Sequence, residues 1–68
     1  MTYPYFWLVV ITQHGVDEPL RTRFYFDRRS AEDAVPGQFK RPVSLFRRSD
    51  SRTVFVVGDY TATVMQAV

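Results

Sequence analysis

The sequence predicts a small α+β domain: a four-stranded antiparallel sheet made from two hairpins, with one short helix between them (ββαββ). Three observations predict this fold. They are an apolar run near the N-terminus, a stretch of strict apolar/polar alternation after it, and a change to helical spacing in the middle of the chain. The chain has 68 residues, which is enough for a single domain, residues 1–68. Its content of 46% hydrophobic and 16% aromatic residues favours an ordered core.

The apolar run at residues 5–11 is the predicted central strand, continuing to about Gln13. Aromatic and β-branched residues favour a strand, and the run is too short for a typical helix. In extended form Trp7 and Val9 share one face with Ile11, while Phe6, Leu8 and Val10 occupy the other. One helix covers only one face, so an apolar face is expected to remain uncovered.

A loop at residues 14–19 leads to the second predicted strand, residues 20–26. Here two sets of residues alternate with the period of a half-buried strand. We expect the more apolar set to face inward and the basic and aromatic set to face outward. The inward set is Leu20, Thr22, Phe24 and Phe26, and the outward set is Arg21, Arg23 and Tyr25.

Helical spacing follows at residues 27–35. Asp27 or Ser30 can cap the helix, and Ala31, Ala34 and Val35 fall on one stripe that can approach a sheet closely. Pro36 and the glycine after it end the helix, so it must be short.

The second hairpin is predicted at residues 43–47 and 53–57, with a turn at residues 49–51. Residues 59–68 remain open between a helix capped by Asp59 and a continuation of the strand after Gly58. The predicted core joins residues from the strands to two alanines of the helix: Trp7, Val9, Ile11, Phe24, Phe26, Leu45, Phe55 and Val57, with Ala31 and Ala34 above them.

The composition argues against catalysis and against a bound metal or cofactor. The chain has no cysteine and one histidine, His14, and it has no Gly-x-Ser-x-Gly or glycine-rich phosphate loop. We therefore expect no enzyme activity, no cofactor and no metal. The lack of cysteine favours the cytoplasm, and the short apolar run gives no reason to expect a membrane partner.

The charge pattern predicts a binding surface. All nine basic residues lie between Arg21 and Arg52, although the net charge is only +2. Arginine and aromatic side chains commonly anchor protein interfaces, so we expect a larger protein partner; basic residues interleaved with aromatics also fit nucleic acid, which is the alternative. The predicted partner-binding residues are Arg21, Arg23, Tyr25, Phe46, Arg48 and Arg52.

The surplus apolar face predicts self-association as well. Phe6, Leu8 and Val10 are expected to form a homodimer seam, which Val54 and Val56 would extend. A C-terminal helix folded back over this face would remove the need for the seam.

The layout of residues 5–48 resembles that of very small phage proteins that inhibit host machinery, such as phage inhibitors of the host RNA polymerase. The shared features are Phe6 and Trp7 opening a strand, a second strand, a short acidic helix with alanines, and a strand that ends in Arg47. The resemblance implies a class of action, which is masking of a larger host protein without catalysis, and it assigns no functional residue.

Overall fold

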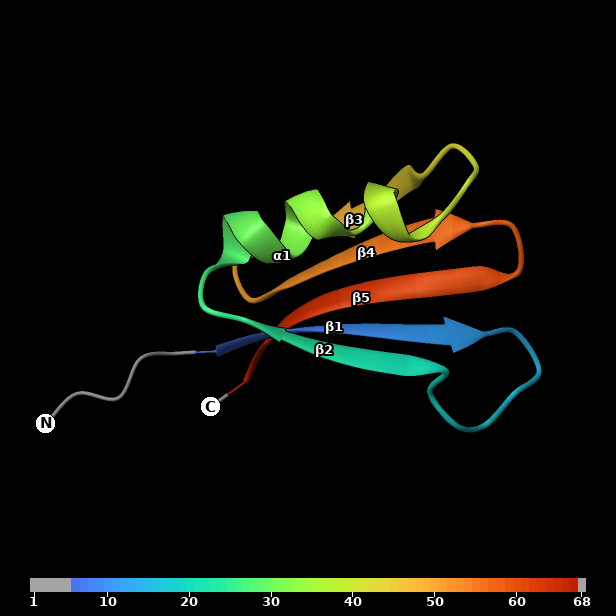
Figure 1. The fold of residues 1–68 in the computed structure, drawn as a ribbon, viewed down its shortest axis with the longest axis horizontal. Coiled ribbons are helices and arrows are strands. Elements are labelled where there is room, and N and C mark those ends of the chain that lie inside the picture. The colour runs from blue at the N-terminus through green and yellow to red at the C-terminus, as the bar shows by residue number, and fades with distance from the viewer. Residues whose placement is uncertain (1–5, 68) are drawn as a thin grey trace, which may run out of the picture.

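The computed structural model describes residues 6–67, which form a five-stranded antiparallel sheet with one short helix against one of its faces (Figure 1). The strand order across the sheet is β2-β1-β5-β4-β3. The elements in chain order are β1 (Phe6–Gln13), β2 (Arg21–Tyr25), α1 (Arg28–Ala34), the 3-10 turn η1 (Pro36–Gln38), β3 (Ser44–Arg48), β4 (Arg52–Val57) and β5 (Tyr60–Ala67). The first residue of the predicted central run, Tyr5, and the last residue of the tail, Val68, lie outside the described residues.

The α+β class, the antiparallel sheet and the single short α-helix are confirmed, but the strand count of four is wrong. The fifth strand is the C-terminal segment, for which a helix and a strand were both open. A two-residue turn at Gly58 and Asp59, where Gly58 has a φ of 57°, reverses the chain so that β5 pairs with β4. Its other edge pairs with β1 along the full length of both strands. β5 therefore joins the two predicted hairpins into one sheet.

The core lies between α1 and the central strands. In the antiparallel register Val9 pairs with Val64 and Ile11 with Ala62, and all four side chains are buried beneath Ala31 and Val35. Trp7 and Phe55 pack against this cluster while partly exposed, and Val57 is buried. Six predicted core residues are therefore buried or packed against the core: Trp7, Val9, Ile11, Ala31, Phe55 and Val57. Ala34 is only partly buried, and Val35 takes the deeper position.

Three predicted core residues are wrong. Phe24 is 69% exposed, Phe26 76% and Leu45 58%. Phe24 pairs with Leu8 and so lies on the face away from the helix, whereas Arg23 pairs with Val9 on the helix side. The two alternating sets lie on opposite faces of the sheet, but the apolar set is on the face away from the helix. The predicted half-buried strand is also wrong, because residues 21–24 are exposed and only Tyr25 is partly buried. Leu45 is exposed because β3 is an edge strand, beyond the reach of the short helix.

The start of α1 matches its predicted cap. Asp27 is extended, and one of its carboxylate oxygens accepts a hydrogen bond from the backbone N–H of Ser30 at 2.8 Å. This backbone hydrogen bond, with a second one from the Ser30 hydroxyl, holds the pKa of Asp27 below its usual range. After Val35 the chain does not leave directly as a loop, because Pro36 begins η1, whose following residue Phe39 packs back against the core.

Candidate binding surfaces

The face of the sheet opposite α1 has no covering element among the described residues, and we call it the open face. Antiparallel pairing places its side chains in rows that cross the strands. One row runs Phe24, Leu8, Met65 and Arg52, and the next runs Thr22, Val10, Thr63, Val54 and Arg47. No carboxylate occupies a position on the open face in the described strands. The face therefore combines apolar, hydroxyl and positively charged groups.

Aromatic side chains gather where β1 begins and β2 ends. Phe6 lies on the open face, and its ring centroid is 5.7 Å from that of Phe26, at a tilt of 43°. Phe24 stands beside them on the edge strand, opposite Leu8. Large apolar side chains exposed together in this way are typical of interaction sites rather than of ordinary surface.

Arginines gather at the other edge of the open face, on β3 and β4, and we call this edge the basic end. Arg47 and Arg52 line a cavity of about 430 Å³ together with Phe46, two serines of the β3–β4 turn and Val54. Phe46 is 71% exposed and sits at an irregularity in the pairing of β3 with β4, between Leu45 and Arg47. The irregular pairing directs both Phe46 and Arg47 toward the open face, where strict alternation would separate them.

The structure does not bring the six predicted partner-binding residues together. Phe46 and Arg52 belong to the basic end of the open face. Arg21, Arg23 and Tyr25 lie on the helix side of β2, because they pair with Ile11, Val9 and Trp7. Arg48 also lies on the helix side, where its guanidinium donates to Glu32 at 3.2 and 3.3 Å. The predicted single surface is thus divided between two faces of the sheet.

The residues predicted for the oligomer seam share one face. Phe6, Leu8 and Val10 all lie on the open face, and Val54 and Val56 extend it across β4. The rival cover, a C-terminal helix, does not form, because residues 60–67 are the strand β5 within the sheet itself. Among residues 6–67 no element covers the open face, and its side chains on β1 and β5 are partly exposed or exposed.

A polar cluster on the helix side was missed by reasoning from sequence. The Thr53 side chain is fully buried, and its hydroxyl donates to Glu32 at 2.6 Å and accepts from Arg28 at 2.9 Å. Arg28 also donates to the carbonyl oxygens of Ser49 and Asp50, and its guanidinium lies 5.3 Å from the centre of a Trp7 ring. Only the spacing of Arg28 and Glu32, four residues apart on a helix, signals any part of this cluster in the sequence.

The carboxylate of Glu32 is the anionic centre of that cluster. Burial raises the pKa of Glu32, but hydrogen bonds from Arg48 and Thr53 and the charges of Arg48 and Arg28 outweigh burial and hold the pKa below its usual range. Each of the cluster's cations already has a structural partner, since Arg28 and Arg48 both pair with Glu32. The cluster ties α1 to the β3–β4 turn.

Across residues 6–67 no group of three histidine or acidic side chains is placed to hold a metal ion. Within that range, too, no helix is both long enough and apolar enough to span a membrane.

Comparisons of the chain with protein-family models, curated proteins and solved structures gave no match. The case for function therefore depends on the geometry of these surfaces.

Proposed function

We propose that this protein is a small non-enzymatic binding module that docks on a larger protein through the open face of its sheet. The observation that carries the proposal is the apolar centre of that face, formed by the partly exposed side chains of Leu8, Val10 and Met65 and flanked by exposed phenylalanines. Burying such side chains against a partner removes apolar surface from water at about 25 cal/mol per Å². Aromatic residues and arginine are also the side chains that most often dominate interface energetics.

The charge on the open face indicates the chemistry of the partner. Arg47 and Arg52 stand at one end, and no acidic side chain on this face of the described strands offsets them. A complementary partner surface would be apolar opposite Leu8 and Phe24 and acidic opposite the two arginines. Docking of this kind would act by masking the partner, which is the class of action that the resemblance to small phage inhibitors implies.

Single-stranded nucleic acid is the second candidate for the basic end of the same face. Phe46 offers a stacking surface between Arg47 and Arg52, and the hydroxyl of Ser51 beside them can donate to a phosphate oxygen, whereas that of Ser49 already donates to the Arg52 carbonyl oxygen. The apolar centre of the face argues against nucleic acid, because it contributes nothing to phosphate binding. Protein docking accounts for both ends of the face, and we favour it for that reason.

The test is a capture experiment from lysate with paired variants. Immobilised wild-type protein, Phe24→Asp and Val16→Asp are compared, each with and without nuclease. Phe24 is exposed on the edge strand of the open face, whereas Val16 is an exposed apolar residue in the β1–β2 loop, so the same change is made on and off the face. We expect a protein that is retained by wild type and by Val16→Asp, survives nuclease, and is lost with Phe24→Asp.

Two outcomes would count against protein docking. Equal capture by Phe24→Asp and wild type would show that the open face is not the contact surface. Loss of capture after nuclease, with binding that weakens linearly in log[salt], would assign the face to nucleic acid.

A further inference from the structure

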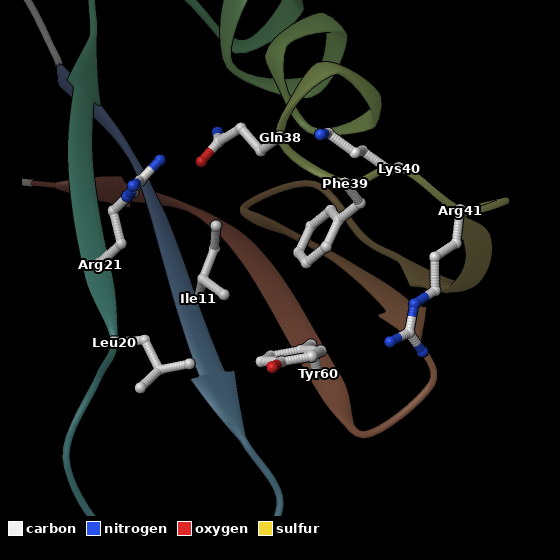
Figure 2. A pocket seen from close by; sticks show the side chains of 8 residues that line it. All are labelled: Ile11, Leu20, Arg21, Gln38, Phe39, Lys40, Arg41 and Tyr60. Carbon is white, nitrogen blue, oxygen red and sulfur yellow. The ribbon is translucent and has the colours of Figure 1, made fainter.

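A pocket lies on the helix side of the sheet, away from the open face. It has a volume of about 460 Å³ and lies between η1 and the ends of β1, β2 and β5 (Figure 2). This volume falls within the range of roughly 300–1,000 Å³ that is typical of small-molecule sites. The pocket shares no lining residue with the cavity beside Phe46.

The floor of the pocket is apolar and aromatic. Ile11 is buried at its base, and Leu20, which is exposed, forms one wall. Phe39 and Tyr60 face each other across the floor, with ring centroids 6.0 Å apart and planes tilted by 48° (Figure 2). Two rings in this arrangement can pack against a third flat ring by edge or face contacts.

Positive charge surrounds this floor. Arg21, Lys40 and Arg41 all line the pocket, and no acidic side chain does. None of the three makes an ion pair with a carboxylate of residues 6–67, in contrast to the arginines bound to Glu32. Figure 2 shows Arg21 on the β2 side, Lys40 on the far side of Gln38, and Arg41 beyond Phe39 at the β4–β5 turn.

Backbone geometry holds the wall of the pocket in place. The N–H groups of Gln38 and Phe39 donate to the carbonyl oxygens of Val35 and Pro36 at 3.1 and 3.4 Å, which fixes the backbone of both residues relative to the end of α1. The Gln38 Oε1 atom is buried and has no hydrogen-bond donor among the described residues. Such an acceptor is costly to leave unpaired, and a donor on a ligand would satisfy it.

We propose that this pocket binds a small anion that carries a flat aromatic ring. The ring packs on Phe39 and Tyr60, and the anionic group, a carboxylate or a phosphate, is held by Arg21 and Lys40 at the rim. Charge-assisted hydrogen bonds from arginine to such groups are among the stronger ones in proteins. The proposal does not rest on the function proposed for the open face.

The experiment is a titration of the intact protein followed by the amide chemical shifts of Ile11, Gln38, Phe39 and Tyr60. The probes are indole-3-acetate and adenosine monophosphate, which present a carboxylate and a phosphate on an aromatic ring. Indole-3-acetamide supplies a ring without charge, and acetate supplies charge without a ring. We expect saturable shifts with at least one ring-bearing anion, and roughly tenfold weaker binding for the two partial probes.

Matched variants show whether the rim charges act specifically. Arg21→Gln and Lys40→Gln should each weaken binding of the ring-bearing anion by roughly tenfold, whereas Arg23→Gln should leave it unchanged. Arg23 lies on the same side of β2 as Arg21 but does not line the pocket. All three side chains are exposed, so the variants should fold. The absence of saturable shifts with both anions, or an equal loss for Arg23→Gln, would overturn the proposal.

Discussion

At the scale of single residues, Arg28 and Glu32 make more side-chain hydrogen bonds and ion pairs than the other residues that the structure describes. Arg28 reaches two carbonyl oxygens of the β3–β4 turn, the Thr53 hydroxyl and the Trp7 ring. Glu32 accepts from Thr53 and Arg48. Because Thr53 is fully buried, its hydroxyl depends on these two partners for its hydrogen bonds.

A first prediction at this scale concerns the charge of Glu32. Glu32→Gln should lower the free energy of unfolding at pH 7 by about 2 kcal/mol, since charge-assisted bonds to Arg48 and Thr53 are replaced by weaker ones. The folded protein holds the pKa of Glu32 below its usual range, so the wild-type advantage is complete at neutral pH and is lost as pH falls through that lowered pKa. Urea denaturation of both proteins at pH 7 and near pH 3 measures the difference.

Glu18→Gln is the matched control, because Glu18 lies exposed in the β1–β2 loop. Its free energy of unfolding should stay within about 0.5 kcal/mol of wild type. A Glu32→Gln deficit that is equally large at both pH values would mean that shape, rather than charge, explains the role of Glu32.

At the scale of elements, α1 is too short to be stable by itself. It has 7 residues, and isolated helices below about 12–15 residues are marginal in water. It forms because Asp27 caps it, the Glu32 cluster ties it to the β3–β4 turn, and Ala31 lies directly against the sheet. The small side chain of Ala31 sets how closely the helix approaches.

We predict that Ala31→Leu will push the helix away from the sheet. The site is fully buried, and adding three carbons to a filled core typically costs 1–3 kcal/mol, so we expect a loss of about 2 kcal/mol. Ala34→Leu on the same helix is the control, since Ala34 is only partly buried and should lose less. Denaturant unfolding compares the two; equal losses would show that the helix does not pack on the sheet at Ala31 as described.

At the scale of the whole molecule, one helix and one five-stranded sheet leave the protein with two unlike sides. The helix side contains the core, the Glu32 cluster and the pocket beside Tyr60. The open face contains the predicted seam residues Phe6, Leu8 and Val10, together with Arg47 and Arg52. The two sides can therefore be altered independently.

We predict that the wild type self-associates through the open face when no partner is present. A two-fold arrangement would place the basic end of each copy over the aromatic end of the other, which keeps like charges apart and sets arginines near phenylalanine rings. Sedimentation at tens of micromolar should show a dimer for wild type and a monomer for Leu8→Asp.

Val16→Asp is the control for added charge and should remain dimeric, while circular dichroism checks that every variant keeps its sheet. A wild type that sediments as a monomer even at several hundred micromolar would rule out the seam, although docking of a different protein on the open face would still be open to the capture experiment.

Much of the local structure could be predicted from the residues themselves. The apolar run after Pro4 predicted β1, the Arg/aromatic alternation predicted β2, and Asp27 with Pro36 marked the region of the helix. These features depend on neighbours within a few positions, which is the range over which strand alternation, capping and proline act.

Only the tertiary structure decided which face of the sheet each side chain occupies. Alternation is symmetrical, so Phe24 and Arg23 could each have faced inward; pairing of Leu8 with Phe24 and of Val9 with Arg23 settled the choice. The same holds for β5, whose sequence fitted a helix or a strand until pairing with both β1 and β4 supplied its hydrogen bonds. The division of the predicted arginines between two faces and the pocket at Tyr60 follow from this long-range register, which residues close in sequence do not encode.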